Sequence, residues 1–199
     1  MKVPVRTLAC ALLASFAIAG SGCGGTSPPV RYFTLASEAP SRAAETVPAY
    51  TIAVGPVTVP EIVDRPHLVL RASPTQVEVA ELARWAAPLK SEIPRVIASE
   101  LGRLLPGAST ATSSQRALSG PDYRVLVDIQ RFDSAPGDSA TIEASWSVRS
   151  RDGVVVDGRS VASEQAGLGY DALVAAHSRA LNGIAKEIAA AIVKLRGER

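Results

Sequence analysis

Hydrophobic and polar residues alternate without exception over residues 141–149. The apolar positions are Ile142, Ala144, Trp146 and Val148. A period of two places these side chains on one face of a β-strand and the polar side chains on the other. Such a strand is typical of an antiparallel sheet with one face on the core. The pattern therefore predicts a half-buried strand with Trp146 in the core.

The segments on either side of this strand continue a β-meander. Residues 123–130 alternate in the same way, with Leu126 as the exception, and residues 135–138 form the intervening turn. Asp152-Gly153 is a sequence favoured in two-residue hairpin loops. Residues 154–163 then return as the next strand. The sequence thus predicts three consecutive antiparallel strands.

Four shorter segments are also predicted strands, because they are rich in β-branched and aromatic residues. They are residues 30–35, 50–59, 67–71 and 76–82. In the second of them, Gly55-Pro56 indicates a bulge or an edge position. In the fourth, alternation places Val77, Val79 and either Ala80 or Leu82 inward and Glu78 and Glu81 outward.

Two segments have the spacing of amphipathic helices. The first is predicted to begin at Ser91 as N-cap, to hold Pro94 in its first turn and to end at Pro106-Gly107. The second runs from about Asp171, its predicted N-cap, to about Arg196, and its apolar stripe recurs every three or four residues. The stripe is Leu173, His177, Leu181, Ile184, Ile188, Ile192 and Leu195.

Residues 108–120 are rich in Ser, Thr and Ala and have no periodicity, so we expect a mobile loop there. The elements together predict an α+β fold. We expect an antiparallel or mixed β-sheet of about six or seven strands with two α-helices packed on one face.

Residues 1–22 have the organisation of an export signal. Lys2 and Arg6 precede an apolar run, and small residues follow it. The run is shorter than the roughly 20 residues of a permanent membrane-spanning helix. Cys23 comes directly after the small residues, which resembles the lipobox of bacterial lipoproteins, where the cysteine is acylated and becomes the first mature residue. The resemblance predicts lipidation at Cys23.

Two features of this leader keep an alternative open. Gly20 stands where the lipobox usually has leucine, and Ala17-Ile18-Ala19 offers a cleavage site for ordinary signal peptidase. If the chain is a lipoprotein, residues 23–29 form a lipidated tether and residues 30–199 form one domain. By resemblance to lipoprotein sorting signals, Gly24 after the cysteine favours the outer membrane.

The charge balance argues against nucleic-acid binding. The chain has 21 Lys and Arg against 19 Asp and Glu, and removal of Lys2 and Arg6 with the signal leaves 19 against 19. A neutral domain lacks the basic surface that binds phosphate backbones. Cys10 leaves with the signal and Cys23 carries lipid, so we expect no disulfide.

Residues typical of catalytic or metal sites are sparse. The chain has two histidines, His67 and His177, which are 110 residues apart and have no metal-ligand spacing around them. Gly167-Leu168-Gly169 lacks the third glycine and preceding strand of a dinucleotide-binding loop. We expect no enzyme activity and no cofactor. We expect His177 to face the core, and His67 to be a turn or interface residue.

Several segments together resemble the ABC-type transport auxiliary lipoproteins, the family of paraquat-inducible protein C. They are YFTL at 32–35, VGPVTVP at 54–60, DRPHLVLR at 64–71, RWAAPL at 84–89 and VAAHSRAL at 174–181. The resemblance implies a lipoprotein on the periplasmic face of the outer membrane. Its implied partners are a mammalian-cell-entry (MCE) domain protein and an inner-membrane ABC transporter, which together move lipids between the membranes. Assembly into a homo-oligomer stays open.

A lipid-anchored domain without catalytic residues suggests a docking role. Our interface candidates are Asp64, Arg65, Pro66, Arg84 and Trp85. The alternative for the corner at residues 60–66 is a purely structural one, in which it holds two strands in register. Trp85 either caps the edge of the core or anchors a partner.

Two other functions remain from the sequence. The first is a structural envelope lipoprotein that acts by self-assembly or protein contacts without lipid transport. The second is a domain that itself carries a lipid, which requires an apolar cavity between the sheet and the helices. Alanine along the second helix favours close packing and argues against such a cavity.

Overall fold

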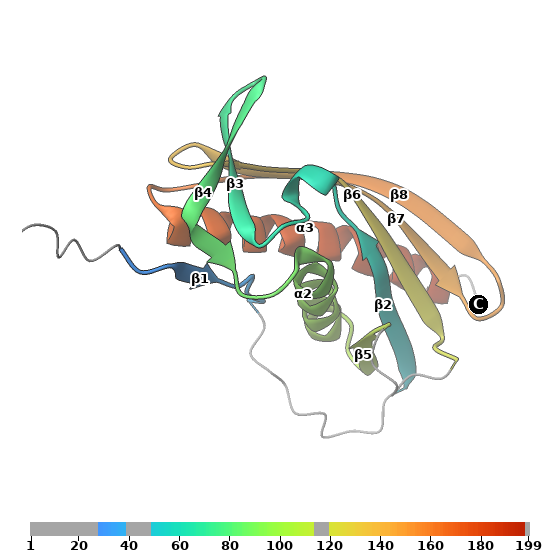
Figure 1. Ribbon diagram of the computed structural model, residues 1–199. Coiled ribbons are helices and arrows are strands. Elements are labelled where there is room, and N and C mark those ends of the chain that lie inside the picture. The colour runs from blue at the N-terminus through green and yellow to red at the C-terminus, as the bar shows by residue number, and fades with distance from the viewer. Residues whose placement is uncertain (1–27, 39–48, 114–119, 198–199) are drawn as a thin grey trace, which may run out of the picture.

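The computed structural model describes residues 28–38, 49–113 and 120–197 (Figure 1). The predicted signal, Cys23 and most of the predicted tether lie outside these residues. The elements in chain order are β1 (Arg31–Phe33), β2 (Tyr50–Thr58), the 3-10 helix η1 (Glu61–Val63), β3 (His67–Ser73), β4 (Gln76–Trp85), α2 (Leu89–Leu104), β5 (Ala108–Thr112), β6 (Tyr123–Ala135), β7 (Ser139–Ser150), β8 (Val155–Gln165) and α3 (Tyr170–Gly197). The α+β class is confirmed. The described part holds eight strands in two sheets, in place of one sheet of six or seven.

The larger sheet is mixed and has the strand order β5-β2-β6-β7-β8. β2 pairs in parallel with both β5 and β6, and β6, β7 and β8 form the predicted antiparallel meander. The predicted inward residues of β6 and β7 are all buried, and Leu126 is exposed. Alternation therefore gave the correct core face for both strands.

α2 and α3 pack against each other and cover the same face of this sheet (Figure 1). α3 lies along β7 and β8, and α2 lies along β2 and β5. Every residue of the predicted stripe on α3 is buried, and its alanines allow close approach to the sheet. No described helix is long and apolar enough to cross a bilayer.

α2 begins earlier than predicted. Pro88 is its N-cap and has an extended backbone, and the amide of Ser91 donates to the carbonyl of Pro88 at 2.8 Å. Ser91 therefore lies inside the first turn, and the expectation that it is the N-cap is wrong. Pro94 lies in the second turn and is buried. The helix ends at Leu104, before Gly107, whose φ of 79° interrupts it.

The expected loop after α2 contains a strand. β5 pairs in parallel with the first half of β2, from Tyr50 opposite Ala108 to Val54 opposite Thr112. Its Ser, Thr and Ala side chains give no periodic signal, because the pairing depends on a strand more than 50 residues earlier in the chain. The remainder of the expected loop, residues 114–119, lies outside the described residues.

A bulge in β2 and the hairpin loop between β7 and β8 each contain a glycine with positive φ. In β2, the register shifts between Val54 and Val57, and Gly55 has a φ of 113°, which confirms the predicted bulge. Between β7 and β8, the amide of Ser150 donates to Val154 and the amide of Gly153 donates to Ser150. This hairpin loop therefore has three residues, where the sequence predicted two.

The smaller sheet has the order β1-β4-β3, and β3 and β4 form a hairpin that projects from the body (Figure 1). Along this hairpin the register jumps from Leu68 opposite Ala80 to His67 opposite Arg84. The irregularity changes which residues face the core. Val79 is exposed, although we predicted it inward, whereas Ala80, Ala83 and Trp85 are buried.

The chain that leaves β1 is fastened to α2 by two buried carboxylates. Glu92 accepts hydrogen bonds from the hydroxyl of Thr34 at 2.5 Å and the amide of Leu35 at 3.1 Å. Two turns later, Glu100 accepts from the hydroxyl of Ser37 and the amide of Glu38, both at 2.7 Å. The sequence gives no local signal for this clamp, because it joins segments about 60 residues apart.

Candidate docking surface

The corner between β2 and β3 is a short, well-braced turn. Pro60 starts η1 in an extended conformation, and the amide of Asp64 donates back to the carbonyl of Pro60 at 3.2 Å. Val63 points into the core, whereas Ile62 exposes 46% of its surface. The corner therefore presents an apolar side chain to solvent on a backbone that the core holds in place.

The structure brings Asp64, Arg65 and Pro66 together on the surface. Asp64 accepts from the ammonium group of Lys90 at 2.5 Å, which ties the corner to the first turn of α2. The carbonyl of Pro66 accepts from the amide of Trp85 at 2.6 Å, which ties it to β4. Arg65 is exposed and makes no ion pair with any described residue.

Trp85 occupies a different environment from these three candidates. It exposes only 5% of its surface and packs edge-on against Phe132 and His177, with ring centroids 6.0 and 6.5 Å away. Its ring is part of the core and is not available to a partner in this structure. Arg84 is half-buried, and its Nε has no hydrogen-bond partner among the described residues.

A small cavity lies beside the corner, between η1, β3, β4 and β6. Its volume is about 100 Å³, and Ile62, Val69 and Phe132 contribute to its wall. Ligand pockets are usually about 300–1,000 Å³, so this space is too small for a lipid chain. A larger concavity of about 590 Å³ includes Leu126 and Asp128 in its lining, on the strand face that lacks helices, so it is not the enclosed cavity that lipid carriage requires.

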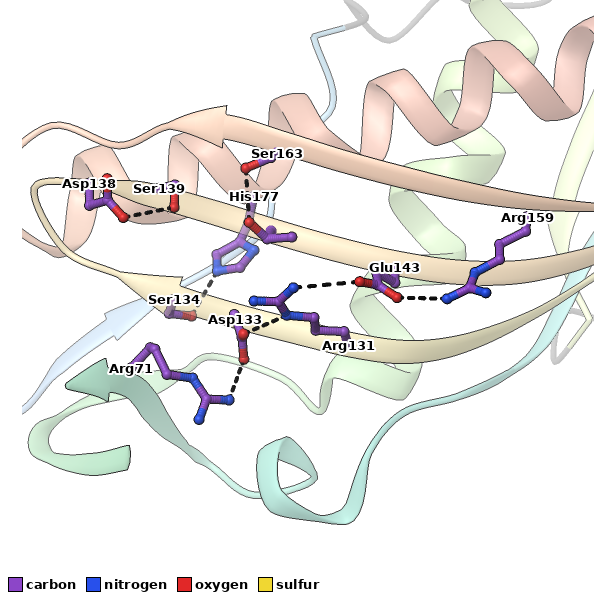
Figure 2. A network of polar contacts seen from close by, with 11 residues as sticks. Arg71, Arg131, Asp133, Ser134, Asp138, Ser139, Glu143, Arg159, Ser163 and His177 are labelled. Atoms are coloured by element: carbon purple, nitrogen blue, oxygen red, sulfur yellow. Dashed lines mark hydrogen bonds and ion pairs between the residues drawn. The ribbon is translucent and has the colours of Figure 1, made fainter. Parts of the chain in front are cut away.

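Alternating charges cross the sheet next to this cavity (Figure 2). Asp133 on β6 accepts from Arg71 on β3 and from Arg131, each at 2.6 Å. Arg131 also approaches Glu143 on β7 at 3.5 Å, and Arg159 on β8 donates to Glu143 at 3.0 Å. We call these five residues the charge ladder. It joins the projecting hairpin to the larger sheet.

Contacts within the charge ladder keep the carboxylate of Asp133 ionised. Burial by itself raises the pKa of Asp133, but the hydrogen bonds from Arg71 and Arg131 outweigh burial and lower it overall. The same contacts raise the pKa of Arg131. Asp133 is therefore ionised at neutral pH, and its charge is neutralised within the protein.

Behind the ladder, His177 forms a buried pair with Ser134 (Figure 2). Its Nε2 lies 2.8 Å from the Ser134 hydroxyl, and its ring stacks on Phe132 with centroids 4.0 Å apart. Burial lowers the pKa of His177 to about 3, although the charge of Asp133 acts in the opposite direction. The imidazole is therefore neutral at physiological pH, and the prediction of a core histidine is confirmed.

This pair lacks the geometry of a catalytic or metal site. Solvent does not reach His177, and Ser134 is also buried. Within the described ranges, no group of three or more His, Cys, Asp or Glu side chains is placed to hold a metal ion. The other histidine, His67, is half-buried at the start of β3.

The sequence predicts the corner as a turn between two strands, but it does not predict the charge ladder. The ladder residues lie at outward positions of strands that the sequence predicted or nearly predicted. Which charges meet depends on the register between strands, and a single sequence does not fix that register. Both acidic and basic residues occur on the polar faces of β6 and β7, and this feature could have suggested ion pairs between the strands.

Solved structures share this fold. A crystal structure of an uncharacterised protein superposes with a TM-score of 0.69 at 20% identity and covers 83% of this chain and 99% of that one. The crystal structure of a protein from Xanthomonas campestris gives a TM-score of 0.61 at 18% identity and covers 79% of this chain and 92% of that one. At these identities the likeness is one of fold.

Sequence comparison gives the family. No curated protein matches the chain significantly. The family model of the ABC-type transport auxiliary lipoprotein component matches residues 33–189, which include α2, most of α3, the corner and the charge ladder. The chain therefore belongs to the family of ABC-type transport auxiliary lipoprotein components.

Proposed function

We propose that the mature chain is anchored by acyl chains on Cys23 to the periplasmic face of the outer membrane. There it is the auxiliary component of an ABC-type system that moves lipids between the inner and outer membranes with an MCE-domain protein. In this proposal residues 1–22 are removed, residues 23–29 form the tether and residues 30–199 form the domain. Family membership and the lipobox-like leader support it.

The anchor gives the domain a role as a docking module. Acyl chains confine it to a surface, and confinement raises its effective concentration for a partner that reaches that surface. The small volume of the cavity at the corner favours contact with a protein over carriage of a lipid inside the domain.

The observation that carries the docking role is the corner at residues 60–66. It offers an exposed apolar side chain, Ile62, close in the chain to an exposed arginine, Arg65, that has no ion pair among the described residues. Arginine and large apolar residues contribute strongly to protein interfaces. The ion pair of Asp64 with Lys90 and the packing of Val63 hold this surface in place, so that binding orders little additional chain.

Co-purification from envelope extracts tests the docking role. An Arg65→Glu variant should fold normally and recover at least about tenfold less MCE-domain protein, which corresponds to about 1.4 kcal/mol of binding. Arg124→Glu is the matched control, because Arg124 is exposed on β6, and it should retain the partner. Full retention by a folded Arg65→Glu variant would refute the corner as the docking surface.

The anchor and the lipid cargo need separate measurements. The mass of the mature N-terminus tests acylation of Cys23, and an unmodified chain starting at Gly20 would refute it. Deletion of the gene should change how phospholipids are distributed between the two membranes. Envelope leakiness without such a change would instead favour a structural lipoprotein.

One feature favours that structural alternative. β8 is the last strand of the larger sheet, so one of its edges has no strand partner in the described part of the chain. Val155 and Val161 on this strand are exposed. Unpaired edges can pair with another copy of the same chain. Chemical cross-linking of the membrane-bound protein distinguishes the two functions, because self-assembly through β8 predicts links between Lys186 residues on the adjacent helix α3.

A further inference from the structure

The chain enters the domain at one end of the molecule. Figure 1 places β1, the start of α3 and the connections β6–β7 and β8–α3 at this end, with the C-terminus at the other. Arg31 on β1 donates to Asp171 on α3 at 2.6 Å, and Phe33 packs edge-on against Tyr170 with centroids 5.9 Å apart. β1 is therefore fixed to the first turn of α3.

Little chain separates this end from the predicted anchor. The described residues begin at Pro28, five positions after Cys23. At about 3.3–3.6 Å per residue, these five positions span at most about 18 Å. The tether cannot lengthen easily by detachment of β1, because Glu92 and Glu100 hold the segment that follows it. Acyl chains at Cys23 thus keep this end of the domain close to the lipid headgroups.

The same end carries an exposed leucine in the loop between β8 and α3. Leu168 exposes 91% of its surface, more than any other large hydrophobic residue in the described part of the chain. The loop is not loose, because the amide of Gly137 donates to the carbonyl of Gly167 at 3.1 Å and the amide of Ala166 donates to Asp138 at 2.9 Å. These two bonds fix the loop to the β6–β7 turn.

A packing contact also holds the leucine outward. A Cβ atom at Gly137 would lie 3.1 Å from Cδ2 of Leu168, so the leucine rests over this glycine of the neighbouring turn. The position has no core contact that explains an apolar side chain, and an exposed leucine in water loses the free energy that burial would provide. A bilayer surface is the apolar environment nearest to it.

We propose that Leu168 inserts into the headgroup region of the bilayer that holds the acyl anchor. This inference rests on the proposed lipidation of Cys23. A single leucine binds membranes weakly, but the acyl chains already supply the affinity, so the leucine need only orient the domain. Tyr32 on β1 exposes 64% of its surface at the same end and suits the same interface, where tyrosine is enriched.

A fluorescence experiment on the full lipoprotein tests this orientation. Leu168→Cys and Val154→Cys variants carry a polarity-sensitive fluorophore in vesicles of phosphatidylethanolamine and phosphatidylglycerol that contain a spin-labelled lipid. Val154 is the control, because it exposes 52% of its surface at the β7–β8 loop. The Leu168 probe should be quenched several-fold more than the Val154 probe, and its emission should shift to shorter wavelength.

The outcomes separate this inference from the proposed function. The mass of the mature N-terminus is measured on the same preparations. If Cys23 is acylated and both probes remain in water, the orientation is wrong and the anchor stands. If Cys23 is unmodified, both the proposed lipid anchor and the proposed insertion of Leu168 fail. If the Leu168 probe is shielded only after a protein partner is added, the loop is a protein contact and the bilayer proposal is overturned.

Discussion

The indole ring of Trp146 lies directly over Gly158, its partner across β7 and β8. A Cβ atom at Gly158 would be 2.2 Å from Cζ2 of this ring, a distance that real atoms do not adopt. The indole Nε1 donates to the hydroxyl of Ser160 at 2.8 Å, and Ser160 donates to Glu187 on α3 at 2.6 Å. Gly158 therefore provides the space for the ring, and Ser160 satisfies its polar edge.

Gly158→Ala should destabilise the domain. The ring cannot move without breaking its bond to Ser160, and overpacking of this kind costs about 1–3 kcal/mol. Urea unfolding followed by tryptophan fluorescence measures the loss. Gly183→Ala on α3 is the control, because its Cβ would lie 3.9 Å from the nearest side chain. Helix propensity predicts that this control gains up to about 1 kcal/mol. Equal unfolding midpoints for the two variants would contradict the packing explanation.

Glu100→Gln should loosen the clamp between α2 and the chain after β1. Glu100 is fully buried, and besides its bonds to residues 37 and 38 it accepts from Nε of Arg103 at 3.0 Å. Hydrogen bonds to charged groups contribute about 1.5–3 kcal/mol, so the variant should lose stability in that range. Glu81→Gln, at an exposed position on β4, should change stability little. The prediction fails if both variants unfold at the same urea concentration.

Glu92 and Glu100 also predict how stability changes in acid. Burial raises the pKa of each, but hydrogen bonds outweigh it, from Arg95 and Thr34 to Glu92 and from Ser37 and Arg103 to Glu100, so both pKa values fall below 4.5. A lowered pKa stabilises the fold at pH values above 4.5, and this contribution is lost as the pH falls through the folded pKa. Below pH 4.5, the wild type should therefore lose stability more steeply than Glu100→Gln.

His177 predicts a second pH dependence, which begins at a higher pH than that of Glu92 and Glu100. Burial lowers its pKa from 6.5 to about 3, so between these values the unfolded chain binds a proton that the folded protein does not. Stability should fall as the pH decreases from 6.5, by up to about 1.4 kcal/mol per pH unit for one proton. A folded His177→Gln variant should show a flatter profile between pH 5 and 6.5. Parallel profiles for variant and wild type would exclude this contribution.

The sequence predicts those parts of the fold in which apolar residues recur at a fixed short spacing. The stripe on α3 and the alternation of β6 and β7 depend on neighbours within a few residues, and the structure confirms their buried faces. β5 and the inward face of β4 depend on strand pairing at a distance and on an irregular register. The sequence contains no periodic signal for β5, and the alternation within β4 places Val79 on the wrong side.

The candidate docking surface also has residues that the sequence predicts and contacts that it does not. The residues of the corner could be named because proline and charge mark a turn between two predicted strands. That Trp85 faces inward follows from the change of register in β4, which the sequence does not show. The meeting of Asp133 with Arg71 likewise depends on how the hairpin folds onto β6.

Asp133→Asn should release the projecting hairpin from the larger sheet. Asp133 holds Arg71, which pairs with Val77 across β3 and β4. Because Arg71 is partly exposed, we expect a loss of about 1–2 kcal/mol for opening the hairpin. Amide hydrogen exchange in residues 71–77 should accelerate by about 5–30-fold, while exchange in α3 changes less.

Asp157→Asn is the matched control for this measurement. Asp157 is exposed on β8 and lies outside the charge ladder, so the same chemical change should leave exchange in the hairpin unaltered. Unchanged protection of residues 71–77 in Asp133→Asn would show that the core contacts of Leu68 and Val69 suffice to hold the hairpin. Accelerated exchange confined to these residues would show that the ladder sets the position of the hairpin beside the corner.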